Sequence, residues 1–161
     1  MIFVTVGTHE QPFNRLVEEI DRLKKEAIIT DDVFIQTGFS TYTPQYCDWK
    51  SIISYSEMEG YMTSADIIIT HGGPATFMGA IARGKKPIVV PRQEKFGEHV
   101  NDHQLDFAEQ VSERFGNITV VEDINELQNY FNLDLNTGFT SNSNNLKFNN
   151  LLKQEVESLV N

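Results

Sequence analysis

The most constraining feature of this sequence is a run of β-branched residues that ends abruptly in two glycines and a proline. The run Ile67-Ile68-Ile69-Thr70 is typical of a strand buried on both faces. His71-Gly72-Gly73 follows at once and predicts a sharp turn, because glycine lets the backbone bend and come close to a ligand. Pro74 favours the first position of a helix, where its missing amide hydrogen is not needed. The stretch therefore predicts a strand, a turn and a helix N-terminus, whose free amides and positive dipole end suit an anion such as a diphosphate.

Two other segments have a loop directly after an apolar strand. Residues 2–6 predict a buried strand, Gly7-Thr8-His9 follows, and a helix is expected from about residue 12 to 26. Residues 87–90 predict another strand, which ends at Pro91 and is followed by Arg92 and Gln93. Ligands of open α/β sheets bind at the carboxyl ends of the strands. We therefore expect the loops at positions 7–9, 71–73 and 92–93 to open onto one crevice.

Strand and helix patterns alternate along most of the chain, which predicts an α/β fold with a doubly wound, mostly parallel sheet. We expect one Rossmann-like domain over residues 1–131, a polar linker over 132–145 and an amphipathic helix over 146–161. Within the domain, residues 51–55 predict a short strand. Ser56 and Glu59 fit a capping box, which predicts a helix that starts at Ser56.

Composition narrows the classes of function. The chain has 161 residues, 23 acidic and 13 basic, and a formal net charge of −10, so a nucleic-acid-binding surface is not expected. Its single cysteine, Cys47, excludes a disulfide scaffold within the chain and favours a cytoplasmic location. No apolar run approaches the roughly 20 residues that a spanning helix needs. These features favour a soluble enzyme or binding subunit.

Four motifs resemble the glycosyltransferase family 28 C-terminal domain, the nucleotide-sugar-binding half of MurG-like GT-B transferases. They occur in the expected order within roughly residues 1–130: Gly7-Thr8-His9, residues 65–73, residues 84–92 and residues 99–104. A chain of this length resembles the stand-alone catalytic subunits of two-component transferases, which include the soluble half of the dolichol-linked N-acetylglucosamine transferase. Residues 90–93 and 97–104 are most similar to the PssE-type subunits of bacterial capsule and exopolysaccharide synthesis.

This resemblance implies an inverting hexosyltransferase. Its donor is a UDP-sugar, UDP-galactose in the PssE-type group, and its acceptor is a lipid-linked sugar. A separate membrane-anchored subunit binds the acceptor and holds the chain at the inner face of the membrane, and in isolation the chain is compatible with a homo-oligomer. No metal and no cofactor other than the donor is expected, because no Asp-x-Asp motif is present. The alternative is a non-catalytic enhancer or nucleotide-binding subunit of another transferase.

The resemblance also implies roles for individual residues. Gly7 and Thr8 approach the diphosphate, whereas His71, Gly72 and Gly73 hold the phosphate and nucleotide. Arg92 and Gln93 lie near the donor. The residues implied for the hexose hydroxyls are Glu98, His99, Asn101, Asp102 and Gln104. One position departs from the pattern: MurG-like proteins have a glutamate that binds the ribose hydroxyls, and Gly79 stands at the matching place. Ribose recognition must then come from elsewhere.

More than one residue is a candidate for the catalytic base. His9 is the best candidate, because it follows the Gly-Thr turn and is expected to face the acceptor. Glu98 and His99 are alternatives, and the partner subunit is another source. His99 and His103 are four residues apart, a spacing that fits two metal ligands on a helix, but no third ligand is evident.

Overall fold

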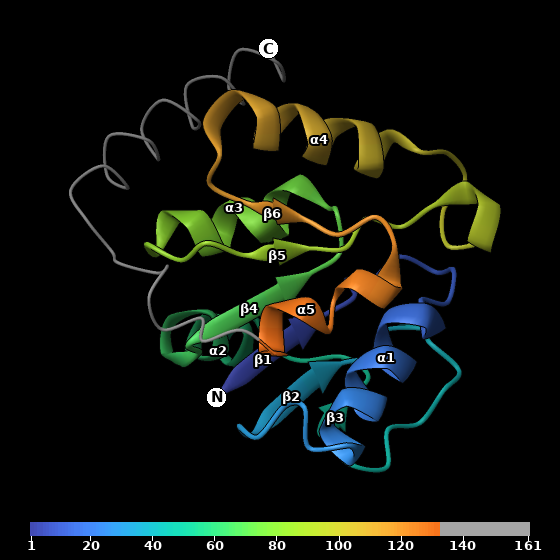
Figure 1. Cartoon of the computed structure of the whole chain (residues 1–161), viewed down its shortest axis with the longest axis vertical. Coiled ribbons are helices and arrows are strands. Elements are labelled where there is room, and N and C mark those ends of the chain that lie inside the picture. The colour runs from blue at the N-terminus through green and yellow to red at the C-terminus, as the bar shows by residue number, and fades with distance from the viewer. Residues whose placement is uncertain (133–161) are drawn as a thin grey trace.

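A six-stranded, fully parallel sheet forms the centre of the molecule (Figure 1). The computed structural model describes residues 1–132. The strand order is β3-β2-β1-β4-β5-β6, and every neighbouring pair is parallel. The strands are β1 (Ile2–Thr5), β2 (Val33–Gln36), β3 (Asp48–Lys50), β4 (Ile67–Thr70), β5 (Ile88–Val89) and β6 (Thr119–Val120). This order confirms the predicted doubly wound α/β fold.

Helices cover both faces of the sheet. They are α1 (Asn14–Lys25), α2 (Tyr55–Ser64), α3 (Pro74–Ala82), α4 (His103–Phe115) and the short α5 (Asn129–Asn132), with 3₁₀ turns η1 (Glu94–Phe96) and η2 (Ile124–Glu126). Helix α1 and the η2–α5 segment lie on one face, whereas α2, α3 and α4 lie on the other (Figure 1). The loops at the carboxyl end of the sheet are therefore framed by helices from both layers.

Alternation along the strands divides the core between the two faces. Ile2 and Val4 of β1 pack with α1, whereas Phe3 between them packs with α2 and α3. The neighbouring strand follows the same rule, since Ile69 joins the α1 layer and Ile68 the opposite layer. A strand buried on both faces reads as a continuous apolar run, which is the pattern that the sequence shows here.

Two predicted boundaries on the β3 side were wrong. The edge strand is Asp48–Lys50, not residues 51–55, and its three residues are all exposed. An exposed edge strand needs no apolar run, and the single large apolar residue of β3, Trp49, does not form one. The next helix starts at Tyr55, because the Ser54 side chain accepts the amide hydrogen of Glu57 and acts as the N-cap in place of Ser56. The predicted linker at 132–145 and helix at 146–161 lie outside the described residues, apart from Asn132.

A buried carboxylate anchors the long connection between β2 and β3. Asp21 of α1 is buried and accepts hydrogen bonds from the Tyr42 hydroxyl at 2.5 Å and from the backbone amides of Gln45 and Tyr46. The bond to Asp21 raises the pKa of the Tyr42 phenol to about 12. Burial, with Asp21 nearby, raises the pKa of the Cys47 thiol to about 12, so this cysteine is a poor nucleophile at neutral pH.

Replacing Asp21 by alanine is expected to destabilise the protein by about 2–4 kcal/mol, because two backbone amides and a phenol lose a charged acceptor. Chemical denaturation monitored by circular dichroism measures this change in the free energy of unfolding. Asp31→Ala, at an exposed carboxylate shortly after α1, is the matched control and should change stability by less than about 0.5 kcal/mol. Equal effects of the two substitutions would contradict the anchoring role of Asp21.

Candidate functional site at the switch point of the sheet

Strands β1 and β4 lie side by side at the point where the strand order reverses, and the loops after them meet there. The chain leaves β1 toward α1 on one face and leaves β4 toward α3 on the other (Figure 1). The His71 amide donates to the Thr5 carbonyl at 3.0 Å, which carries the pairing of the strands into the loops. This geometry places both loops at the carboxyl edge of the sheet, where α/β proteins bind ligands in a crevice.

The His71 imidazole fills the space between the backbones of Gly7 and Gly73. A Cβ atom on Gly7 would lie 2.5 Å from His71 Nε2, and one on Gly73 would lie 2.2 Å from His71 Cε1. Gly7 also has a φ of +78°, which favours glycine independently of the contact. Both glycines therefore let the imidazole pack directly against the backbone of two loops.

The protonation state of His71 follows from this packing. Burial, reinforced by the nearby Arg92 charge, lowers the pKa of the imidazole to about 4, so the ring is neutral at pH 7. Its Nδ1 atom accepts the Gly73 amide hydrogen at 3.1 Å, so the proton of the neutral ring is on Nε2. Nε2 is buried and has no hydrogen-bond partner among the described residues. The site thus contains an unpaired buried donor at the crevice.

The N-terminus of α3 adds a positive dipole end beside His71. Gly73 is the N-cap, Pro74 occupies the first turn, and Pro74 and Ala75 are exposed. No acidic side chain lies in the first turn of this helix. The helix start therefore remains open to an anion.

Gln104, in the first turn of α4, joins two of the loops. Its Oε1 atom accepts the amide hydrogens of Gly72 and Arg92, each at 3.1 Å, and its Nε2 lies 3.5 Å from His71 Nδ1. The sequence predicted a contact between Gln104 and the sugar. In the structure the side chain is already engaged in fixing the loops after β4 and β5, and sugar contact stays a prediction.

Arg92 is completely buried and holds three carbonyl oxygens. Its guanidinium donates to Val6 O at 2.7 Å, to Gln11 O at 2.6 Å and to Glu98 O at 3.0 Å, and it stacks over the Phe13 ring at 5.0 Å. Desolvation lowers the pKa of this guanidinium to about 10, which leaves it charged at pH 7. In this structure Arg92 therefore fixes the loop after β1 to the loop after β5, with no surface of its own in the crevice.

Glu98 and Gln93 are also buried, and both stabilise the loop after β5. The Glu98 carboxylate forms a two-pronged ion pair with Arg15, at 2.9 and 3.0 Å, and accepts the Gln93 amide hydrogen at 3.1 Å. The Gln93 side chain donates to Glu122 O at 2.9 Å. Both were predicted to lie near the donor or the hexose. In the structure their polar groups are paired inside the protein, and contact with the donor or the hexose stays a prediction.

The remaining predicted residues lie on the rim of the crevice. Thr8 and Asp102 are exposed, whereas His9, His99 and Asn101 are half-buried. The rings of His9 and His99 stack, with centroids 4.6 Å apart and planes 18° apart. Asn101 accepts the His103 amide hydrogen at the start of α4, and Asp102 accepts that of Glu94. The structure therefore brings His9, His71 and His99 to one region, with Asn101 and Asp102 on the same rim.

Sequence reasoning missed two residues that organise this rim. Gln11 bonds both His9 and Gly97, and Arg15 pairs with Glu98. In the sequence, the only sign of a role for Gln11 is that it is polar and lies two positions after His9. Arg15 carries no motif that marks it as buried, yet its side chain is largely buried. At Gly79 the structure offers no carboxylate, since the nearest atom to an added Cβ is an Arg83 nitrogen at 3.6 Å.

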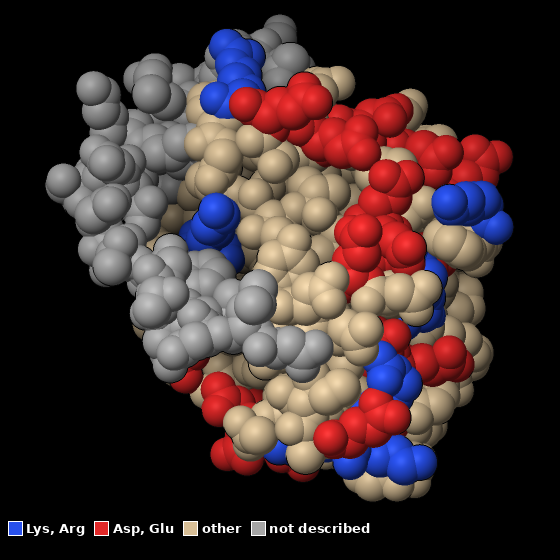
Figure 2. Space-filling view, viewed as in Figure 1, with Lys and Arg blue, Asp and Glu red and all other residues tan. Residues whose placement is uncertain are grey.

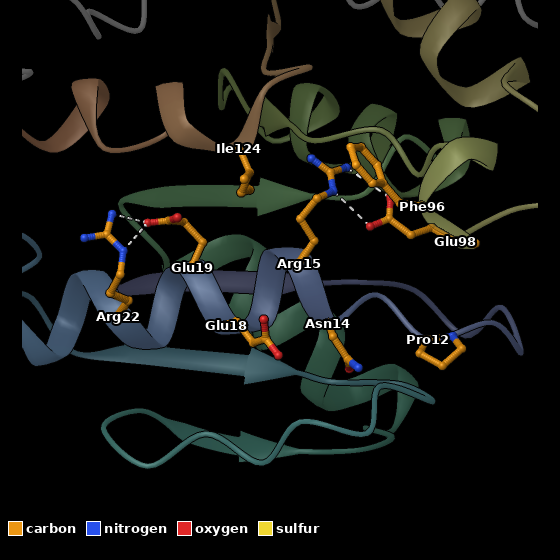
Figure 3. Close-up of a pocket in the computed structure, with 10 residues that line it drawn as sticks. Pro12, Asn14, Arg15, Glu18, Glu19, Arg22, Phe96, Glu98 and Ile124 are labelled. Carbon is orange, nitrogen blue, oxygen red and sulfur yellow. Dashed lines mark hydrogen bonds and ion pairs between the residues drawn. The ribbon is translucent and has the colours of Figure 1, made fainter.

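A separate groove of about 550 Å³ runs along α1 beneath η1 and Ile124 (Figure 3). Figure 3 shows Arg15 reaching from α1 to Glu98 beside Phe96, and Arg22 turned toward Glu19. Because both arginines are already paired with carboxylates, this groove offers no unpaired cation for a phosphate. The glycine-lined crevice, rather than this groove, has the features of an anion site.

Acidic side chains dominate the outer surface of α4 and the segment that follows β6. Asp106, Glu109 and Glu113 on α4 are exposed, as are Glu122 and Glu126, and Figure 2 shows acid side chains along this part of the molecule. Partial desolvation, together with the carboxylates of Glu122, Asp106 and Glu113, raises the pKa of Glu109. Within residues 1–132, no cluster of three His, Cys, Asp or Glu side chains is arranged to hold a metal ion. The same residues contain no helix that is long and apolar enough to span a bilayer.

A doubly wound parallel sheet with glycine-lined loops at its switch point is typical of nucleotide-binding α/β domains. Comparison with known families refines this class: residues 1–155 match the glycosyltransferase family 28 C-terminal domain. The chain belongs to this family, as the sequence motifs predicted. The match extends beyond the described residues at its C-terminal end.

Individual relatives agree with this assignment. The chain is 30% identical over 119 residues to the human UDP-N-acetylglucosamine transferase subunit ALG13, a match that covers 68% of this chain and 10% of that protein. The chain therefore spans about a tenth of the length of this relative. The fold is similar to the glycosyltransferase SnogD from Streptomyces nogalater, with a TM-score of 0.55 at 19% identity over 84% of this chain and 35% of that one. The fold is also similar to the glycotransferase of kitacinnamycin, with a TM-score of 0.64 at 15% identity over 98% of this chain and 39% of that one.

The neutral state of His71 predicts a specific pH dependence of stability. An unfolded chain binds a proton at this histidine below about pH 6.5, whereas the folded protein resists protonation until about pH 4. The unfolded state therefore binds more protons in this window, and stability falls as the pH is lowered through it. The contribution of His71 is up to about 3 kcal/mol.

Urea denaturation of the wild type and of His71→Asn at several pH values between 7 and 4 measures this contribution. The variant should show a smaller loss of stability across the window, because it has no imidazole to protonate. His103→Gln removes an exposed histidine at the start of α4 and serves as the control. Parallel stability curves for the wild type and His71→Asn would show that His71 is not held neutral by the fold.

Proposed function

We propose that this chain is the donor-binding, catalytic subunit of an inverting UDP-sugar-dependent hexosyltransferase. The observation that carries the proposal is the unpaired His71 Nε2 donor, held between Gly7 and Gly73 beside the open N-terminus of α3. A buried donor without a partner is costly unless a ligand completes it. A diphosphate supplies acceptor oxygens and negative charge, and both the donor and the helix dipole favour them.

The same rim accommodates the chemistry of the transfer. The leaving UDP carries developing charge, which the His71 N–H and the α3 N-terminus stabilise without a metal ion or other cofactor. The hexose then extends toward the exposed rim, where His99, Asn101 and Asp102 offer imidazole, amide and carboxylate groups. His9 is the proposed base for the acceptor hydroxyl, because its half-buried ring remains accessible on this rim.

A partner subunit is part of the proposal. ALG13 is named as a subunit, and the two similar glycosyltransferase structures are chains of which this fold matches 35% and 39%. We propose that a membrane-anchored subunit supplies an acceptor-binding half and brings this chain to the inner face of the membrane. The PssE-type motifs favour galactose as the hexose, a lipid-linked sugar as the acceptor and capsule or exopolysaccharide as the product. The acidic outer surface disfavours direct binding to anionic lipid.

One observation favours a second function. Gly79 stands where related transferases have a ribose-binding glutamate, and the structure provides no carboxylate at that position. A subunit that stabilises another transferase without binding a donor does not need this contact. Direct measurement of nucleotide binding separates the two functions.

Isothermal titration calorimetry with UDP is expected to show binding by the wild type, which Gly73→Ala weakens at least about tenfold, or about 1.4 kcal/mol. The reason is steric, because the new methyl group would lie 2.2 Å from the His71 ring and displace it, whereas the φ of −70° at this position is compatible with alanine. Gly60→Ala is the matched control, since nothing lies within 4 Å of its added Cβ. A folded wild type that does not bind UDP or UDP-sugars would exclude the catalytic function and leave the enhancer function.

Replacing His9 by alanine is expected to lower kcat by about a hundredfold or more while UDP affinity stays within about twofold, because the base acts on the acceptor and not on the diphosphate. The measurement is sugar transfer to a lipid-linked acceptor by the chain together with its membrane-anchored partner, alongside calorimetry of the same variant. The control is Glu10→Gln, at the next, exposed residue. Unchanged turnover in His9→Ala would assign the base to another residue or to the partner.

A further inference from the structure

Gln11 makes two side-chain hydrogen bonds that together determine how its amide is oriented. Its Nε2 group donates to the Gly97 carbonyl at 3.2 Å, and its Oε1 atom lies 2.8 Å from His9 Nε2. A carbonyl oxygen can only accept, so the NH₂ group must face Gly97, because the reverse orientation would bring two oxygens together. The amide oxygen therefore faces the histidine.

This orientation determines the position of the proton on His9. The Gln11 oxygen can only accept, so His9 Nε2 must donate. A neutral imidazole carries one proton, and the other ring nitrogen then has a free lone pair. That nitrogen is Nδ1, and no hydrogen bond reaches it from any described residue.

His99 restrains the same ring from its face. The two imidazoles stack at 4.6 Å and 18°, so Gln11 fixes one edge of His9 while His99 fixes its plane. The loop that carries Gly97 and His99 is in turn held by Arg92, which donates to the Glu98 carbonyl between them. Burial, with His9 and Arg92 nearby, lowers the pKa of His99 and favours a neutral stacking partner.

From these contacts we infer that Gln11 is a positioning residue, which holds His9 as the Nε2–H tautomer and leaves Nδ1 as the proton acceptor. The catalytic part of this inference rests on the proposed function, whereas the tautomer does not. In the reaction, Nδ1 takes the proton of the acceptor hydroxyl as its oxygen forms a bond to the anomeric carbon. The bond from that carbon to the diphosphate oxygen breaks, and UDP leaves with the electron pair. The imidazolium that results keeps its Nε2–H bond to Gln11, so no rearrangement is needed.

A purely structural role for Gln11 gives different expectations. In that case its bond to Gly97 matters because it joins the loop after β1 to the loop after η1, and the state of His9 is incidental. Gln11→Glu distinguishes the two roles, because a carboxylate still accepts from His9 Nε2 but cannot donate to Gly97. Gln11→Leu removes both bonds, and Glu10→Gln is the control at the neighbouring exposed position.

Long-range ¹H–¹⁵N correlation spectra of the full-length protein, recorded at about pH 8, where an unperturbed imidazole is neutral, report the protonation of each ring nitrogen. We expect wild-type His9 to show a single form with a protonated Nε2 and an unprotonated Nδ1. Gln11→Glu and Glu10→Gln should keep this pattern. Gln11→Leu should give averaged nitrogen shifts from two tautomers, with UDP affinity changed by less than about twofold.

The kinetic readout uses the same variants with the acceptor-binding partner present. Gln11→Leu should lower kcat at least about tenfold with little change in the KM for the donor, and Gln11→Glu should recover most of this loss. A proton on Nδ1 in the wild type, a wild-type spectrum in Gln11→Leu, or Gln11→Glu behaving like Gln11→Leu would overturn the inference. If the spectra are as expected while His9→Ala keeps full turnover, the proposed base is wrong and only the tautomer assignment stands.

Discussion

The buried guanidinium of Arg92 is the interaction on which the rest of the site depends. A charge without access to water is stable only when its hydrogen bonds are made inside the protein. Arg92 makes them with carbonyl oxygens of residues 6, 11 and 98, which belong to the loops after β1 and β5. Moving either loop would take some of these acceptors away from a buried charge. The geometry of the rim, including the stack of His9 on His99, is therefore set by a residue that has no surface in the crevice.

A second layer of constraint fixes the loop after β4. Gln104 holds the amides of Gly72 and Arg92 through one oxygen, and the His71 ring is wedged against the glycines on either side. In these contacts, most polar groups of the loops form hydrogen bonds with one another. They leave His71 Nε2 unpaired next to a helix N-terminus, and Thr70 Oγ1 and Arg92 Nε are also buried without a partner among the described residues. The proposed anion site thus rests on a donor that the scaffold leaves unpaired at the start of α3.

The sequence predicted the scaffold of the site better than the roles of its polar residues. Apolar runs such as Ile67–Ile69 specify buried strands, and glycine after a strand specifies a tight turn, because each depends on local chemistry. Both features placed the β1 and β4 loops together correctly. Whether a polar side chain faces a ligand or a neighbouring loop depends on partners distant in sequence. Glu98 pairs with Arg15 across 83 positions and Arg92 reaches Val6 across 86, so no local pattern could indicate that these residues are buried.

The fixed loops and the open rim play different parts in the proposed transfer site. The loops at the switch point are held by Arg92, Gln104 and the glycine contacts, whereas the exposed groups on the rim have few internal partners. Thr8 and the free Nδ1 of His9 make no side-chain hydrogen bond to any described residue. A base with an unpaired lone pair becomes productive only when an acceptor hydroxyl is placed against it and water is excluded. This chain leaves that side of the rim open. The open rim supports the proposed partner subunit, whose surface would place the acceptor hydroxyl against His9.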